Sequence, residues 1–318
     1  TGGTGFLGRV ILSVLANENV RCLGRQKPSA LSAASFYKRD ITADADFSVP
    51  VKDAKVLIHC AARVHIMENN STSPLEDFRE VNTFGTLNLA QQAADAGVKR
   101  FIFISSIKVN GESTVSGVPF KADDVFIPTD PYGLSKYEAE RGLEQIAIKT
   151  GMEVVIIRPP LVYGPGVKAN FASMMMWVYR GLPLPLGGIN GNKRSLVSVD
   201  NLVDLIVTCI EHPNAANKTF LVSDDDDVST TQLLVDMAIA LNVPNRLISI
   251  PNNWLTVVAK LIGKREITKR LFGSLQVDIS KTKELLNWQP PFSRAKSMKK
   301  TADNFVKKAI SKEDNTNK

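Results

Sequence analysis

The sequence predicts an α/β fold, with a doubly wound parallel sheet in the first half of the chain and a smaller domain in the second half. Three observations predict it. Short apolar runs rich in β-branched residues alternate with segments of helical periodicity, a glycine-rich turn opens the chain, and glycine and proline become frequent after Tyr163. Because strand–helix alternation is typical of parallel sheets with helices on both faces, the first half is expected to form the sheet.

Five runs are expected to form buried strands, because several of them are apolar nearly throughout, as strands buried on both faces are. They are NVRCLGR at 19–25, SFYKRDIT at 35–42, AKVLIHCAA at 54–62, KRFIFISS at 99–106 and MEVVIIRPP at 152–160. The segments between them with helical spacing are 9–18, 78–97 and 130–151. The last two of these segments end at glycines, which commonly stop helices.

The first residues, TGGTGFLG, form a turn of the kind that binds dinucleotides. The stretch fits the spacing G-x-x-G-x-x-G and, counted from Gly3, also G-x-G-x-x-G. Such glycines permit a tight turn and close approach of the backbone to a pyrophosphate, which binds at the N-terminus of the following helix. The turn therefore predicts a Rossmann-type cofactor site. The residues expected to form it are Gly2, Gly5, Phe6, Leu7 and Gly8.

The domain boundary is expected where the composition changes, near Tyr163. Residues 1–162 are interpreted as the NAD(P)-binding domain and residues 163–318 as a substrate-binding domain. Part of 195–222 is expected to rejoin the first domain. The chain begins at the turn itself, so the strand that ordinarily precedes such a turn is missing and a truncated start is expected.

The composition argues against several classes of protein. Of the 318 residues, 44% are hydrophobic and 22% are charged, which are ordinary values for a globular chain and argue against disorder. No apolar run reaches the ~18–20 residues of a transmembrane helix, so no integral membrane segment is expected. The small numbers of cysteines and histidines, three of each, argue against a disulfide framework or a metal site and favour a cytoplasmic location.

The net charge of +7 favours anionic ligands. Many of the basic residues lie in the last twenty-five residues, which are expected to form a solvated terminal helix. Nucleic acid is not an expected partner, because no aromatic platform is interleaved with these lysines.

The residues after the run at 19–25 bear on the choice of cofactor. An acidic residue at such a position accepts the ribose hydroxyls of NAD, whereas this chain has Arg25. A guanidinium suits the 2′-phosphate of NADP(H), so NADP(H) is favoured and NAD(H) remains possible. The alternative is that Arg25 stacks on adenine or faces solvent. Asp40, at the end of the next run, can accept a hydrogen bond from the adenine amino group.

Tyr132 and Lys136 are four residues apart in a helical segment, so their side chains share one face. We expect Lys136, together with an oxidised nicotinamide, to lower the pKa of Tyr132 so that the phenol transfers a proton to or from the substrate oxygen. Ser106 ends the run at 99–106, at the sheet edge where ligands bind, and its hydroxyl can hold that oxygen. Ser105 is expected either to contact the cofactor or to be a turn residue without a functional role.

Together these motifs resemble the extended short-chain dehydrogenase/reductase superfamily, in its nucleotide-sugar epimerase, dehydratase and reductase branch. The resemblance covers nearly the whole chain. Its further motifs are HCAA at 59–62, NTFGTLNL at 82–89, RPPLVYGPG at 158–166, RSLVSVDNLVD at 194–204 and VDISKTKELLNWQP at 277–290. The resemblance implies a UDP-sugar held between two domains. It implies cofactor contacts at Asp40, Ile41, Ala61, Ala62, Asn82 and Pro159, and contacts with the nucleotide diphosphate at Asn170 and Arg194.

Departures from the family pattern separate its branches. Ile107 and Lys108 follow Ser106 where dehydratases carry acidic residues, so a dehydratase is not expected, and Asn110 stands where epimerases usually carry tyrosine. The stretch SSIKVNGE is similar to enzymes of bacterial surface-polysaccharide synthesis. With Arg25, this favours an NADPH-dependent reductase of a UDP-4-keto-6-deoxy-N-acetylhexosamine.

Three alternatives to the reductase remain open. The first is a 4-epimerase of UDP-glucose or UDP-N-acetylglucosamine with tightly bound NAD. The second is a non-catalytic NADP-sensing regulator on the same fold, which has no need of the Tyr132–Lys136 pair. The third is a hydroxysteroid-type reductase, against which the polar Asn170 and the region of Arg194 argue.

A homodimer is expected from the helical segments at 78–97 and 130–151. Each segment places one face on the sheet, yet their apolar residues extend beyond one narrow stripe. The residues that suggest this further surface are Leu87, Ala94, Tyr137, Leu143 and Ile146. Pairing of the two helices across a two-fold axis would form a four-helix contact.

Overall fold

The computed structural model describes residues 1–29, 35–64, 73–250 and 271–316. Its strands are β1 (Arg21–Gly24), β2 (Ser35–Lys38), β3 (Val56–His59), β4 (Arg100–Ile104), β5 (Glu153–Arg158), β6 (Leu161–Tyr163), β7 (Leu196–Ser198) and β8 (Lys218–Leu221). Its α-helices are α1 (Phe6–Val14), α2 (Ser48–Val51), α3 (Pro74–Arg79), α4 (Thr86–Asp95), α5 (Pro131–Thr150), α6 (Ala169–Tyr179), α7 (Val199–Glu211), α8 (Thr230–Leu241), α11 (Ser280–Leu286) and α12 (Arg294–Thr316). Short helices of other types are the π-helix η1 (Glu80–Gly85) and the 3₁₀-helices η2 (Ile107–Val109) and η3 (Pro213–Ala215).

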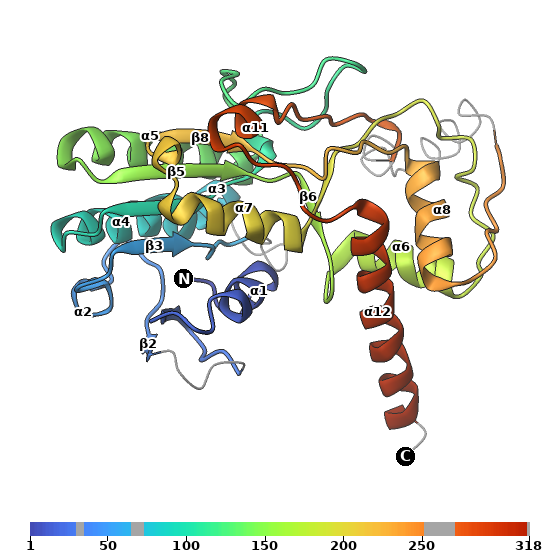
Figure 1. Ribbon diagram of the computed structural model, residues 1–318, viewed down its shortest axis with the longest axis horizontal. Helices are drawn as coiled ribbons and strands as arrows, with labels where there is room; N and C mark the ends of the chain where they lie inside the picture. Colours follow the sequence, from blue (N-terminus) through green and yellow to red (C-terminus); the bar gives the residue numbers. More distant parts are fainter. Residues whose placement is uncertain (30–34, 65–72, 251–270, 317–318) are drawn as a thin grey trace.

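The central sheet contains parallel strands in the order β3-β4-β5-β8, with helices on both faces (Figure 1). β1 pairs with β2 and β6 pairs with β7, also in parallel. Each run expected to form a strand contains one of β1 to β5, and the expected fold class is confirmed. β8 joins β5 after the chain has passed through β6, α6, β7 and α7, so a late segment returns to the sheet.

Alternate residues of β4 enter two different cores. Phe101 and Phe103 belong to a core with residues of α4 and α5, whereas Ile102 and Ile104 belong to a core with residues of α1 and α7. Because successive side chains of a strand point to opposite faces of the sheet, a strand covered on both faces carries apolar residues at every position. This explains the continuous apolar run that the sequence shows here.

A cavity of about 1050 Å³ lies between β1 and β3. Its walls include residues 20–23 and 54–58, with Ile11 of α1 and Val207 of α7. Across this gap the described residues of β1 form no ladder with β3.

The C-terminal part of the chain forms a lobe beside the carboxyl ends of the sheet strands (Figure 1). α6, α8 and α12 share a core that contains Phe171, Met237 and Met298. The basic terminal helix therefore differs from the solvated helix expected from its composition, because Met298 and Ala302 of its first turns are buried. In the parts of the chain that the structure describes, no helix combines the length and the apolar character that crossing a membrane requires.

Candidate active site

The glycine turn has a geometry that only glycine permits at two of its positions. Gly2 has φ +73°, and a Cβ atom there would lie 2.7 Å from the backbone nitrogen of Ala61. A Cβ atom on Gly8 would lie 2.1 Å from the carbonyl oxygen of Gly2. The amide of Gly5 donates to that same oxygen over 2.9 Å. Of the two possible glycine spacings, the turn therefore uses G-x-x-G-x-x-G, which starts from Gly2. Gly3, the start of the other spacing, faces the side chain of Leu12.

The N-terminus of α1 fits the pyrophosphate of a dinucleotide. Gly5 is the N-cap residue and has no side chain to bind the first amides of the helix, and Phe6 and Leu7 follow it as half-buried residues. Free amides at a helix N-terminus, together with the helix dipole, favour an anion. The exposed backbone of Gly5 leaves this end of the helix open. The residues present therefore fit the phosphate part of a nicotinamide dinucleotide.

The predicted contacts with the adenosine part lie at the ends of β1 and β2. Arg25 is exposed and follows β1 directly. Asp40 is exposed after β2, and its carboxylate accepts from the amide of the buried Ile41 over 3.0 Å. Both positions follow the carboxyl ends of parallel strands, which is the edge where such cofactors bind.

Asn82 joins two parts of the site. The buried side chain accepts from the amide of Arg63 over 2.8 Å and donates to its carbonyl oxygen over 3.0 Å. It also donates to the hydroxyl of Ser135, over 3.1 Å. Asn82 thus connects the segment after β3, where the half-buried Ala61 and Ala62 lie, to α5. It lies in the π-helix η1, and π-helical turns are frequently found at functional sites.

Local sequence explains why α5 begins where it does. Asp130 is the N-cap, its carboxylate accepts from the amide of Gly133 over 3.2 Å, and Pro131 occupies the first helical position. Gly151 ends the helix in the left-handed conformation. Tyr132 therefore lies in the first turn of a 20-residue helix, with Lys136 one turn further along.

Tyr132 lies beside Ser106, as expected. The hydroxyl of Ser106 is close enough to the phenol to lower its pKa. Burial is nevertheless the main influence on the phenol: it raises the pKa of Tyr132 to about 12, the charge of Asp130 acts in the same direction, and the hydroxyl of Ser106 opposes both. Lys136 does not contribute to this shift in the chain itself, and its effect together with an oxidised nicotinamide stays a prediction.

Lys136 is buried among apolar groups. Its ammonium donates to the carbonyl oxygen of Ile104 over 3.0 Å and lies 4.4 Å from the centre of the Phe103 ring. Burial lowers the pKa of Lys136 to about 8, while the nearby Cys60 and Glu140 act in the opposite direction. The ammonium of Lys136 therefore loses its proton at a pH much closer to neutral than an exposed lysine does.

The remaining predicted residues divide between the sheet edge and the C-terminal lobe. Pro159 is buried after β5, and its carbonyl oxygen accepts from the amide of Ile107 over 3.0 Å. Ser105 is buried too, but its hydroxyl donates to Glu140 over 2.5 Å, so this hydroxyl points into the protein and not towards a cofactor. Asn170 is exposed in the first turn of α6.

Arg194 connects separate segments of the second half of the chain. Its backbone forms two hydrogen bonds with Val228, of 2.8 and 3.0 Å, and its guanidinium donates to the carbonyl oxygen of Gly273 over 3.0 Å. Burial lowers the pKa of Arg194. The structure thus gives Arg194 a structural role beside the predicted role towards a diphosphate.

Two charged residues of the site were not predicted from the sequence. Glu140 of α5 and Arg158 of β5 form a buried ion pair directly behind Ser105. A signal for Glu140 was present, because it follows Lys136 by four residues and so shares its helix face. The sequence holds no corresponding signal for Arg158, because arginine at the end of a strand is more often exposed.

Residues 1–223 match the model of the "NAD dependent epimerase/dehydratase family". The chain belongs to this family. The expected branch of the short-chain dehydrogenase/reductase superfamily is thereby confirmed, as is the expectation of an NAD(P)-dependent enzyme.

Individual relatives act on sugars at C4, according to their names. The chain is 53% identical over 309 residues to a UDP-glucose 4-epimerase of Vibrio cholerae, with 96% of this chain and 94% of the relative covered. It is 25% identical over 304 residues to the N-acetyl-α-D-glucosaminyl-diphospho-ditrans,octacis-undecaprenol 4-epimerase of Escherichia coli O157:H7, covering 88% and 86%. Among solved structures, that of a UDP-glucose 4-epimerase with UDP-glucose from Thermotoga maritima superposes with a TM-score of 0.75 at 22% identity, covering 97% of this chain and 98% of the other. That likeness establishes the fold.

Proposed function

We propose that this chain of the epimerase/dehydratase family is a UDP-glucose 4-epimerase. The observation that carries the proposal is the 53% identity to a UDP-glucose 4-epimerase over almost the full length of both chains. The placement of Tyr132, Lys136 and Ser106 at the carboxyl edge of the sheet supports it. This reverses the order of the sequence-based hypotheses, in which a reductase came first and an epimerase second.

The side chains of the site fit the proton transfers of the proposed reaction. Tyr132 takes the proton of the sugar C4 hydroxyl as that carbon is oxidised, and the hydroxyl of Ser106 donates a hydrogen bond to the resulting carbonyl oxygen. A nicotinamide dinucleotide, when bound, would supply the acceptor and then the donor of the hydride at C4. After the sugar has turned its other face to the site, Tyr132 returns the proton. The reaction is redox-neutral overall, so no cofactor is consumed.

We propose NAD as the resident cofactor, because an epimerase needs a cofactor that stays bound and is not consumed. The exposed Arg25 after β1 favours the alternative, a reductase that uses NADPH. Mass spectrometry of the purified protein distinguishes the two: NAD released on denaturation supports the epimerase, and a protein that takes up only NADPH supports the reductase. In the second case, the substitution Arg25→Ala should weaken NADPH binding and leave NADH binding unchanged.

The activity is tested by proton NMR of UDP-glucose incubated with the protein and no added NADPH. The expected result is an approach to an equilibrium with the C4 epimer, UDP-galactose. Incubation with UDP-N-acetylglucosamine in parallel determines which sugar is preferred. A protein that leaves both sugars unchanged, but oxidises NADPH in the presence of a 4-keto sugar, would replace this proposal with the reductase.

The substrate is proposed to bind between the sheet, as the cofactor-binding part, and the C-terminal lobe that carries Asn170. Its nucleotide diphosphate is proposed to contact Asn170 and Arg194. A cytoplasmic location agrees with the free thiols of Cys22, Cys60 and Cys209.

We propose a homodimer, although the structure removes part of the argument for it. Leu143 and Ile146 are buried in the chain's own core, and Leu87 and Ala94 pack against that core. Phe84 and Ile148 are the exposed apolar residues of η1 and α5. Light scattering should find twice the chain mass of 34.8 kDa, and a stable monomer at micromolar concentration would refute the dimer.

A further inference from the structure

A buried carboxylate lies on the same helix face as Tyr132 and Lys136. Glu140 follows Lys136 by four residues and Tyr132 by eight, so the three side chains stand on successive turns of α5. The side chain of Glu140 is 0% exposed. A carboxylate so far from water is tolerated only when it is paired and hydrogen-bonded.

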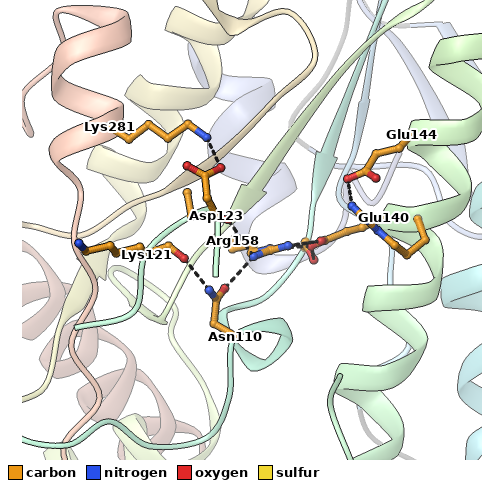
Figure 2. A network of polar contacts seen from close by, with 10 residues as sticks. Asn110, Lys121, Asp123, Glu140, Glu144, Arg158 and Lys281 are labelled. Atoms are coloured by element: carbon orange, nitrogen blue, oxygen red, sulfur yellow. Dashed lines mark hydrogen bonds and ion pairs between the residues drawn. The ribbon is translucent and has the colours of Figure 1, made fainter. Parts of the chain in front are cut away.

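Glu140 has both of these kinds of partner. One of its oxygens accepts from the hydroxyl of Ser105 over 2.5 Å and from Nε of Arg158 over 3.0 Å. The other oxygen accepts from the terminal nitrogen Nη2 of Arg158 over 2.6 Å. Figure 2 shows the guanidinium of Arg158 lying between Glu140 and Asn110. The two-point contact between arginine and carboxylate restricts the orientation of both side chains.

Three successive turns of α5 thereby contact three successive residues at the end of β4. Tyr132 lies beside Ser106, the ammonium of Lys136 donates to the carbonyl oxygen of Ile104, and Glu140 accepts from the hydroxyl of Ser105. A shift of the helix along the strand would break all three contacts at once. Of the three, only the contact of Glu140 is part of an ion pair.

Arg158 extends this arrangement to the segment that follows Ser106. Its other terminal nitrogen donates to the side-chain oxygen of Asn110 over 3.0 Å and to the carbonyl oxygen of Ala122 over 3.3 Å (Figure 2). Asn110 in turn donates to the carbonyl oxygen of Lys121 over 2.8 Å. The side chain that departs from the family pattern at position 110 is therefore a buried partner of Arg158.

We propose that Glu140 and Arg158 are a positioning pair that holds Tyr132 and Lys136 of α5 in reacting geometry against Ser106. Glu140 fixes the helix to the end of β4, and Arg158 fixes β5 and the segment around Asn110 to Glu140. The inference rests on the proposed function in one respect, that Tyr132 moves the proton. Misplacement of a reacting group by ~1 Å can cost on the order of 10²-fold in rate, and this is the loss that the pair prevents.

The test replaces both partners, because removal of one leaves a buried charge without its partner. In the paired variant Glu140→Met with Arg158→Met, the contacts that position α5 are lost while the volume is kept. We expect kcat for UDP-glucose epimerisation to fall about 10²-fold while KM stays within about threefold. The milder variant Asn110→Ala leaves the ion pair in place, and we expect kcat to fall about threefold to tenfold, on the scale of one lost hydrogen bond.

The control is the paired variant Arg100→Met with Glu153→Met. These two residues form an ion pair at the other end of the same strands, β4 and β5, remote from Tyr132. We expect this variant to lower Tm but to keep kcat within about twofold. Loss of kcat in proportion to loss of Tm in both paired variants would mean that Glu140 and Arg158 only stabilise the fold, and would overturn the proposal.

A second readout does not depend on catalysis. Amide hydrogen exchange at residues 132–140 should be faster in the Glu140/Arg158 variant than in the wild type, and unchanged at those residues in the control variant. If the wild type does not epimerise UDP-glucose, the proposed function fails, and hydrogen exchange still decides the positioning role. Wild-type exchange at 132–140 in the Glu140/Arg158 variant, or wild-type kcat, would overturn that role.

Discussion

Buried arginines lie at opposite ends of the same two strands. Arg100, the first residue of β4, donates to Glu153 over 2.7 Å and to the carbonyl oxygen of Cys209 at the end of α7 over 2.7 Å. Arg158, the last residue of β5, donates to Glu140 over 2.6 Å. Both arginines are 6% exposed. Each arginine thus pairs with a glutamate, but the side chain of Glu153 is 40% exposed whereas that of Glu140 is 0% exposed.

The surroundings of the two arginines differ. Arg100 lies among backbone carbonyls at the C-terminal end of a helix, which favours a cation there whatever the protein does. Arg158 pairs with Glu140, which accepts from the hydroxyl of Ser105 and lies one helical turn after Lys136. In a parallel sheet, ligands bind at the carboxyl edge. Similar pairs therefore do different work: the one at the amino end secures the end of a helix, whereas the one at the carboxyl end positions the helix that carries Tyr132 and Lys136.

The largest expected effect is at the carboxyl edge. The substitution Tyr132→Phe removes the transferable proton and keeps the ring, so kcat should fall by roughly 10²–10⁴ with little change in cofactor binding. Steady-state kinetics and a cofactor titration measure this. Tyr137→Phe, on the next turn of α5, is the matched control and should keep wild-type kcat. Near-wild-type turnover in Tyr132→Phe would show that Tyr132 does not carry the proton.

The next effect concerns Lys136 and pH. Because the pKa of Lys136 is about 8, its ammonium form is present below that pH and is lost as the pH rises through it. If turnover needs the ammonium, kcat should decline above about pH 8 in the wild type.

The variant Lys136→Met should lose most activity, and its residual rate should instead rise with pH. Burial holds the pKa of Tyr132 at about 12 in the chain itself, and the variant lacks the ammonium that we expect to lower this pKa when the nicotinamide is bound, so its phenolate forms only at high pH. A pH–rate profile of both proteins measures these trends. The same profile in wild type and variant would contradict a role of the ammonium.

A smaller effect on turnover is expected at Arg194, in the second half of the chain. Arg194→Ala should raise KM on the order of 10-fold, for a lost charge-assisted contact of ~1.5–3 kcal/mol, and should change kcat less, because the diphosphate is remote from C4. The bond from Arg194 to Gly273 means that Tm must be measured beside KM. Lys193→Ala, at an exposed neighbour, is the control. A variant that melts early but binds UDP normally would show that Arg194 is structural.

The smallest effect on turnover is expected at the amino end of the strands. Arg100→Met leaves carbonyl oxygens at the end of α7 without their donor, which should lower the free energy of unfolding by about 1–3 kcal/mol and leave kcat unchanged. Urea denaturation and steady-state kinetics at a temperature well below Tm measure the two quantities. A loss of kcat in Arg100→Met would contradict the inference that only the pair at the carboxyl end of the strands affects turnover.

Local patterns were enough to predict much of this protein. The continuous apolar run at 101–104 predicted a strand covered on both faces, and the glycine turn predicted an open helix N-terminus. The four-residue spacing of Tyr132 and Lys136 placed both on one face of α5. Each of these predictions depends on the backbone period or on a conformation that only glycine adopts, and both properties are encoded in a few consecutive residues.

Tertiary structure alone decided the environment of those residues. The periodicity of α4 and α5 did not reveal that Leu143 and Ile146 face the chain's own core. The spacing of Tyr132 and Lys136 did not reveal that burial raises one pKa and lowers the other. Glu140 and Arg158 are separated by 18 residues and meet only because α5 crosses the ends of β4 and β5. Burial and partners come from packing between distant segments, whereas the sequence by itself determined the elements and the face of α5 that carries the chemistry.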